Sequence, residues 1–583
     1  MKQLWLCLIS ISVFLASNAP LLQAQSASVK NSGESVPVNA DFNYYLNLCN
    51  LLINQQKYAE ALAICDRTIN MKKKDAVLWA MRSEILFNLE RHEEAIASAL
   101  AALQLRKNFS FALLQQCRSE SALGNYEKAI ATCEKALQIN KDWGKLSPAV
   151  AWYNKALALE LSKQFTPALA AYEQALKLQP NYSLALASQC RVLSTTAEYN
   201  LAISTCNKAL EINQNWENSS SAQVWYLLGL NFQRWGKYEI VRSSCPPPSN
   251  VSAEIATIQT NECIKKIRLD RLQSAIDAYE KAVALNPKDA KAWTQQAALL
   301  TELNRYTQSK IALEAALKLS PNYSFALATQ CATLNKLGNY QAALAACDSA
   351  LQGDGRWDEN GLAYPLVQRS QALSGLGQHE EALATVERAL SLESDLIQAW
   401  NTQSVIFWQM QKYPEALQAN DRLLKIAPNF FSAWFNRGGI LRAMKQNESA
   451  VQAYDRALAS DITLVSANTL ADVWVNRSTA LWDLGKYEEA INSTTAAIGL
   501  NPNSVIAWFN RGVLLDTLKR YPEAAIAYEK AALLDPKQDQ IWFALGVVLL
   551  RLNRNQDALI AFEEALKINP NNASAKQNRD SLL

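Results

Sequence analysis

The fold is decided by a stretch that recurs: residues 149–182 read AVAWYNKALALELSKQFTPALAAYEQALKLQPNY, and residues 505–538 read VIAWFNRGVLLDTLKRYPEAAIAYEKAALLDPKQ. Both stretches are 34 residues long. Both have Trp at place 4, an aromatic residue at place 17, Ala at places 20 and 27, Tyr at place 24 and Pro at place 32. Such a fixed period is the sequence signature of a repeat architecture.

The same period runs through nearly all of the chain after residue 41. Ala occupies place 20 in thirteen of the copies, Ser309 being the exception, and nine copies have Trp at place 4. This pattern resembles the tetratricopeptide repeat (TPR) family. Fourteen copies start at residues 42, 76, 110, 149, 183, 222, 290, 324, 363, 397, 431, 471, 505 and 539.

The resemblance implies an all-α fold, a right-handed α-solenoid of about fourteen helix–turn–helix repeats. In each repeat, small residues at places 8 and 20 let the first helix (A) approach the second (B). Seven repeats have Pro at place 32, which ends helix B. One hairpin cannot bury its own apolar face, so neighbouring repeats must stack. We expect the A helices to line a concave groove, and residues 573–583 to form a polar capping helix.

Inserts interrupt the array. The sixth repeat has 34 extra residues, at about 238–271, and shorter inserts follow Trp143, Trp216, Trp357 and Leu464. We therefore divide the repeats into 42–357, which holds repeats 1–8 with this insert, and 358–572, which holds repeats 9–14.

The amino terminus predicts export. Lys2 precedes an apolar run over residues 4–16, too short for a comfortable bilayer span but typical of a secretory signal. We expect a signal peptide over 1–24 with cleavage after Ala24, a flexible linker over 25–41, and no stable membrane span afterwards. The favoured location is extracytoplasmic, in a bacterial periplasm; secretion, or anchoring by an uncleaved segment, is the alternative.

Cysteine spacing supports that compartment. Ten cysteines remain after the signal peptide, and four pairs lie sixteen residues apart, always at places 8 and 24 of one repeat. The two places face each other across one hairpin, and the fifth pair brackets the insert of repeat six. The alternative is ten reduced, buried thiols, but paired occupancy favours disulfides and an oxidising compartment. The predicted pairs are Cys49 with Cys65, Cys117 with Cys133, Cys190 with Cys206, Cys245 with Cys263, and Cys331 with Cys347.

Composition argues against several function classes. Lys+Arg (57) and Asp+Glu (54) leave a net charge of only +3, which offers no basic face for nucleic acid. The only two histidines, His92 and His379, both occupy place 17 and are interpreted as packing residues. Carboxylates recur at place 25, where we expect solvation or pairing with Arg. We predict no catalytic residue, cofactor or metal, and therefore no enzyme.

Candidate partner-binding residues lie on the A helices from the tenth repeat onward. In the TPR family, places 2, 5, 6, 9, 12 and 13 tend to face the groove; here they include aromatic residues and a row of Asn at place 6. Arg437, Arg477 and Arg511 follow that row and are expected to pair with repeat carboxylates. For the aromatic rings, packing between adjacent A helices is the alternative. The candidates are Trp408, Phe435, Asn436, Asn476, Trp482, Phe509, Asn510 and Phe543.

Two functions follow as hypotheses. The first is an exported, non-enzymatic interaction scaffold that binds a protein or peptide in the groove. The alternative is an envelope assembly factor or accessory subunit that presents client proteins, or polysaccharide, to a separate enzyme. The family's charged clamp for a carboxy-terminal peptide, with Lys at place 5 and Asn at place 9, is not matched.

Overall fold

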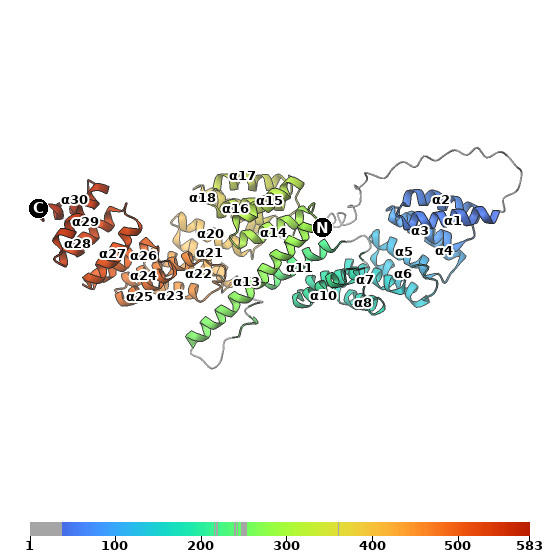
Figure 1. Cartoon of the computed structure of the whole chain (residues 1–583), viewed down its shortest axis with the longest axis horizontal. Coiled ribbons are helices and arrows are strands. Elements are labelled where there is room, and N and C mark those ends of the chain that lie inside the picture. Colours follow the sequence, from blue (N-terminus) through green and yellow to red (C-terminus); the bar gives the residue numbers. More distant parts are fainter. Residues whose placement is uncertain are drawn as a thin grey trace. The chain divides into compact units, whose positions relative to one another are not determined.

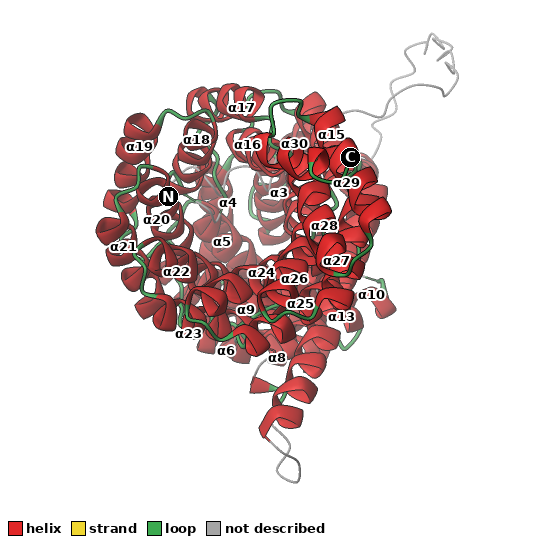
Figure 2. Cartoon of the chain, turned by 90° about the vertical axis from the view of Figure 1, so that its left-hand side faces the viewer, coloured by secondary structure: helices red, strands yellow, loops and turns green. Residues whose placement is uncertain are grey.

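The computed structural model describes residues 38–214, 216, 220–237, 241, 243–246, 253–358 and 361–583. The predicted signal peptide and residues 25–37 of the predicted linker lie outside them. Within the described residues, all regular elements are helices, and no strand occurs (Figure 2). No described helix is both long and apolar enough to cross a membrane.

The chain divides into two compact units, Met1–Ser147 and Pro148–Leu583. In both units, consecutive helices pair as the A and B helices of one repeat (Figure 1). This confirms the predicted all-α solenoid of TPR hairpins. The helices of the first unit are α1 (Val38–Asn54), α2 (Tyr58–Met71), α3 (Ala76–Asn88), α4 (His92–Leu105), α5 (Ser110–Ala122) and α6 (Tyr126–Ile139).

The second unit holds repeats four to fourteen and one terminal helix. Repeats four to nine comprise α7 (Pro148–Leu161), α8 (Phe165–Leu178), α9 (Ser183–Thr195), α10 (Tyr199–Ile212), α11 (Ser221–Trp235), α13 (Ala253–Leu285), α14 (Ala290–Glu302), α15 (Tyr306–Leu319), α16 (Ser324–Lys336), α17 (Tyr340–Gln352), α18 (Ala363–Gly375) and α19 (His379–Leu392). The remaining helices are α20 (Ile397–Gln409), α21 (Tyr413–Ile426), α22 (Phe431–Ala443), α23 (Asn447–Leu458), α24 (Ala467–Asp483), α25 (Tyr487–Leu500), α26 (Val505–Thr517), α27 (Tyr521–Leu534), α28 (Asp539–Arg551), α29 (Asn555–Ile568) and α30 (Ala573–Asp580).

Small residues set the distance between the helices of a hairpin. Place 20 is completely buried in all fourteen repeats, including Ser309. In eight repeats, place 8 faces place 24 of the same repeat in one of two ways. Four repeats join the two places by a disulfide, and four put Gly at place 8 against an aromatic ring at place 24. The Gly–ring pairs are Gly229–Tyr279, Gly438–Tyr454, Gly512–Tyr528 and Gly546–Phe562.

All five predicted cysteine pairs are disulfides, which confirms the pairing within repeats. Their Cα–Cα distances of 5.3–6.0 Å lie within the normal range for this bond. Four of them join helix A to helix B of one hairpin, and the fifth lies in the insert of repeat six. The bonds are Cys49 to Cys65, Cys117 to Cys133, Cys190 to Cys206, Cys245 to Cys263, and Cys331 to Cys347.

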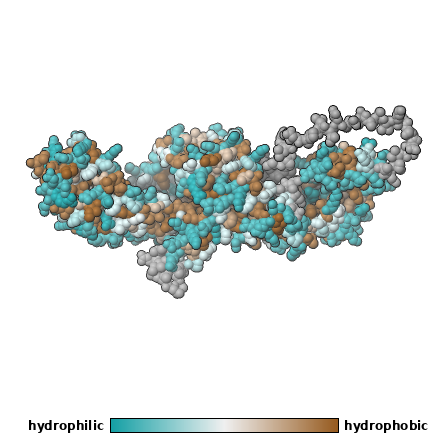
Figure 3. Space-filling model, in the orientation of Figure 1, coloured by the Kyte–Doolittle hydropathy of each residue, from teal (hydrophilic) through white to brown (hydrophobic). Residues whose placement is uncertain are grey.

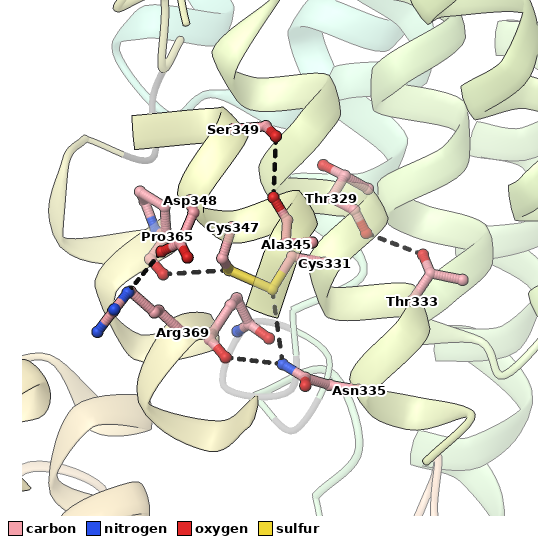
Figure 4. Close-up of a disulfide and its surroundings, with 11 residues drawn as sticks. Thr329, Cys331, Thr333, Asn335, Ala345, Cys347, Asp348, Ser349, Pro365 and Arg369 are labelled. Atoms are coloured by element: carbon pink, nitrogen blue, oxygen red, sulfur yellow. Dashed lines mark hydrogen bonds and ion pairs between the residues drawn. A yellow bond between two sulfur atoms is a disulfide. The ribbon is translucent and has the colours of Figure 1, made fainter. Parts of the chain in front are cut away.

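The last of these disulfides also borders the next repeat. Figure 4 shows Cys331–Cys347, which joins α16 to α17. One turn further along α16, Asn335 donates from Nδ2 to the carbonyl of Gln368 in the next repeat at 2.8 Å. The same part of helix α16 therefore holds both its own helix B and the neighbouring repeat.

The Trp residues at place 4 do more than fill space. In six repeats the indole N–H donates to the backbone carbonyl six residues earlier, at 2.7–3.1 Å. That carbonyl follows the previous helix B, where it has no helical partner. The other three, Trp152, Trp225 and Trp474, follow an insert. Each bond therefore pins one repeat to the end of the repeat before it.

Charged pairs also join neighbouring repeats. Arg at place 7 donates to Asp at place 25 of the preceding repeat in Arg82–Asp66, Arg369–Asp348, Arg437–Asp421 and Arg477–Asp455. This confirms Arg pairing at those four carboxylates, including for Arg437 and Arg477. Arg511 instead donates to Thr495, because Thr occupies place 25 of the preceding repeat.

The histidines are half-buried at the turns between paired helices. His92 packs against Phe87 with ring centroids 5.5 Å apart, and burial lowers the pKa of its imidazole. This contact agrees with a packing role for His92.

Three of the loops that lead into the short inserts fold back on their own repeats. Repeats three, five and eight each begin with Ser, and each Ser hydroxyl accepts a backbone N–H from the loop after helix B. The bonds are Lys141 N to Ser110, Gln214 N to Ser183, and Gly355 N to Ser324, at 3.0–3.1 Å. The longer links therefore dock on the repeat that they follow.

Two helices of the second unit, α13 and α30, depart from the regular pattern of paired A and B helices. In repeat six the described part of the insert from Ala253 onward is helical and continuous with helix B, so α13 is 33 residues long. At the carboxy terminus, α30 packs Ala575 into the core of the last repeat, and Asn569 and Asn572 both donate to Asp539. The last hairpin thus has a small polar cover.

Candidate functional site

The A helices lie on the inner side of the second unit. Successive A helices contact one another directly, as in α18–α20, α20–α22, α22–α24 and α24–α26. Successive B helices show no comparable contact among the described residues. Since a curved stack brings its inner elements closer together, the A helices line the concave face.

Two of the predicted binding residues are exposed on that face. Trp408 on α20 and Trp482 on α24 both occupy place 12, and they are 47% and 42% exposed. A tryptophan normally buries most of its large apolar surface. These two side chains therefore offer unpartnered anchor surface on repeats ten and twelve.

The three predicted phenylalanines are half-buried. Phe435, Phe509 and Phe543 at place 5 pack on the place-24 ring of their own repeat, with centroids 6.2, 5.6 and 6.0 Å apart. Those rings are the ones that face Gly at place 8. The phenylalanines thus contact helix B of their own hairpin and present only part of each ring to the groove.

The three predicted asparagines have different partners. Asn436 donates to Asn401 Oδ1 on the preceding A helix at 3.1 Å, and Asn476 donates to the carbonyl of Asp472 on its own helix at 2.8 Å. Asn510 makes no hydrogen bond to another described residue. The amide of Asn510 and the Oδ1 of Asn476 are therefore open to a ligand.

The sequence did not predict that polar side chains on the groove side of repeats nine to eleven bond to one another. Besides Asn436–Asn401, Gln371 donates to Thr402 at 3.0 Å, and Ser374 donates to Gln409. These bonds join successive A helices. Amide and hydroxyl residues at groove places on adjacent repeats were the available signal, but only the Asn row was recognised. The Asn side chains with a polar group available to a ligand are therefore those of repeats twelve and thirteen, Asn476 and Asn510.

One ion pair joins groove places of the last two repeats. Arg551 on α28 forms an ion pair with Asp516 on α26, at places 13 and 12. Asp516 stands in the same row as Trp408 and Trp482.

A separate hollow lies on the B-helix side. It measures about 680 Å³ and is lined by residues of α21, α22 and α23, among them Leu417, Lys425, Trp434 and Arg456. The Arg437–Asp421 ion pair also borders it. None of the predicted binding residues lines this hollow.

A buried carboxylate elsewhere has a structural role. Glu160 accepts from Arg191 at 2.6 and 3.0 Å and from the Tyr172 hydroxyl at 2.7 Å. Burial, with the neighbouring carboxylate, raises the pKa of Tyr172 well above its usual value. The three side chains satisfy one another between repeats four and five.

Sequence models described as tetratricopeptide repeat match most of the described array. The matched residues are 76–109, 109–181, 266–289, 278–310, 367–429, 402–463, 475–539 and 539–572. The chain belongs to the tetratricopeptide repeat family. No curated protein matches this TPR chain in sequence.

Several solved structures resemble this TPR protein. The APC/C hetero-tetramer Cut9–Hcn1 is 15% identical, with a TM-score of 0.43, over 93% of this chain and 96% of that one. YrrB, described as a TPR protein with an unusual peptide-binding site, is 18% identical with a TM-score of 0.30, over 33% of this chain and 97% of its own. PilF of Pseudomonas aeruginosa is 17% identical with a TM-score of 0.34, over 38% and 97%.

Proposed function

We propose that this TPR protein is an exported, non-enzymatic scaffold that binds an extended peptide segment of a partner protein on the concave face of repeats ten to fourteen. The exposure of Trp408 and Trp482 on that face carries the proposal, because large aromatic side chains are the usual anchors of protein interfaces.

The binding mode follows from the side chains at hand. The two indole rings would bury apolar side chains of the partner, while Asn510 and the Oδ1 of Asn476 would pair with its backbone. A peptide backbone has an N–H and a C=O at most residues, so amides that both donate and accept suit it. The half-buried rings of Phe435, Phe509 and Phe543 would form the floor between the anchors.

The proposed compartment is oxidising. Five disulfides in one chain are rare in reducing cytosol and common after export. Together with the signal-like segment 1–24, they support a location in the bacterial periplasm. The same location suits the alternative role of an envelope assembly factor.

Site-specific photo-crosslinking tests the proposal. A photoreactive phenylalanine analogue replaces Trp408 or Trp482 on the concave face, or Ile526 or Ile560 on the B helices, in the full chain expressed in its host. Ile526 and Ile560 are matched controls, because they are apolar and 56% and 52% exposed. We expect both Trp positions to give one common stoichiometric adduct that the Ile positions lack.

Other outcomes separate the alternatives. Many different adducts from the Trp positions would favour an assembly factor with several clients. Equal adducts from the Trp and Ile positions would contradict a binding site on the concave face.

A further inference from the structure

Helix α13 breaks the rule that a repeat in a solenoid contacts only its neighbours. It is 33 residues long, whereas the B helices on either side, α10 and α15, have 14. At 1.5 Å per residue, its extra turns extend helix B by roughly 28 Å. Figures 1 and 2 both show its amino-terminal end projecting beyond the hairpins around it.

The extra turns reach a distant repeat. Arg268 on α13 forms an ion pair with Asp461, which lies 193 residues later in the loop after α23. Both side chains are largely buried, with 11% and 19% of their surface exposed. Leu464 of the same loop packs against the cluster that contains Leu272 and Leu300. Repeat six is thereby joined to the link between repeats eleven and twelve.

Both ends of this contact are held in place. On α13, Arg271 donates to the carbonyl of Trp235 at 2.7 Å and lies 3.5 Å from the centre of its ring. Further out, the Cys245–Cys263 disulfide ties the insert to the helix. In the loop, Asp461 accepts from the backbone N–H of Thr463 and donates its own N–H to the carbonyl of Asn429.

We propose that α13 is a strap that joins repeat six to the link between repeats eleven and twelve and fixes the curvature of the intervening A helices. A stack held only by neighbour contacts can bend a little at each interface, and the small changes add along the array. A specific contact across five repeats removes that freedom. A buried ion pair suits this role, because a buried charge that loses its close partner is costly, and without Asp461 the nearest carboxylate to Arg268 is Glu302 at 3.9 Å.

The test uses the full oxidised chain with Arg268→Gln, Asp461→Asn, the double variant and the control Asp455→Asn. Asp455 lies six residues before Asp461 and forms the same type of ion pair, but with Arg477 of the adjacent repeat. It is therefore the control for loss of a local pair. Hydrogen exchange is measured in residues 260–271 and 459–466. Small-angle X-ray scattering measures the maximum dimension of the protein.

We expect Asp461→Asn to speed exchange in residues 260–271 on the order of tenfold and to lengthen the particle, since local opening of the strap becomes easier. The double variant should be affected no more than either single one, since it leaves no buried charge without its partner. Asp455→Asn should leave residues 260–271 unchanged. The strap would be disproved if Asp461→Asn affected only repeats eleven and twelve, or if the two single effects multiplied in the double variant.

Discussion

At the scale of single residues, places 8 and 24 set how closely the two helices of a hairpin approach. Where place 8 is Gly, an added methyl group would meet the ring opposite; at Gly438 it would lie 2.4 Å from an atom of Tyr454. The Tyr454 ring is fully buried, and burial raises the pKa of its hydroxyl to about 12. The backbone of α22 at Gly438 therefore lies directly against the Tyr454 ring.

Two adjacent glycines offer a matched comparison. Gly438→Ala should destabilise the protein by about 1–3 kcal/mol, because the buried ring has no space to move into. Gly439→Ala should be neutral or stabilise by up to about 1 kcal/mol, since a methyl group there meets nothing within 4 Å and Ala favours a helix. Urea unfolding of both variants measures the difference. Equal effects would contradict the close approach at place 8.

The sequence predicted some residue roles better than others. Cysteine pairs such as Cys117–Cys133 could be predicted because two facing places change together. The indole hydrogen bonds of Trp residues such as Trp79 could not, because an apolar pattern does not report an N–H donor. Phe435, Phe509 and Phe543 were predicted at groove-facing places, with packing between A helices as the alternative; they are half-buried against helix B of their own hairpin.

At the scale of the hairpin, the disulfides divide the repeats into two kinds. Cys331–Cys347 covalently joins α16 to α17, whereas α22 and α23 have no covalent link and are held by packing, including that of Gly438 against Tyr454. A closure of this length contributes about 3 kcal/mol in the loop-entropy account. Helix boundaries were predictable from the repeat, but the continuous α13 was not, because its Thr, Ile and Lys residues fit several structures.

Reduction should loosen the cross-linked hairpins first. With reductant, hydrogen exchange should rise in residues 42–357 and change little in residues 363–572, because repeats nine to fourteen contain no cysteine. Alkylation of the unreduced mature protein, which should label no cysteine, is the control. A uniform rise along the chain would show that the disulfides do not act locally.

At the scale of the whole molecule, the period in the sequence was sufficient to predict the solenoid, because each repeat packs mainly on its neighbours. A pattern that repeats every 34 residues cannot predict a contact such as Arg268–Asp461, because its partners are 193 residues apart. The sequence also does not identify the partner, because exposed anchor residues do not specify one ligand as catalytic residues would specify a reaction. The candidate site is therefore defined by exposure on the concave face.

Binding and stability measured together on the same variants test the central claim most directly. The partner is the protein crosslinked at Trp482, purified and titrated with the wild type, the double variant Trp408→Ala with Trp482→Ala, and Phe435→Ala. The Trp variant should lose at least about tenfold in affinity while its unfolding stays nearly unchanged, because both rings are exposed. Phe435→Ala should instead cost about 2–4 kcal/mol of stability, as its ring packs on Tyr454. Unchanged affinity in the Trp variant, or a loss of stability comparable to that of Phe435→Ala, would contradict the proposed concave binding site.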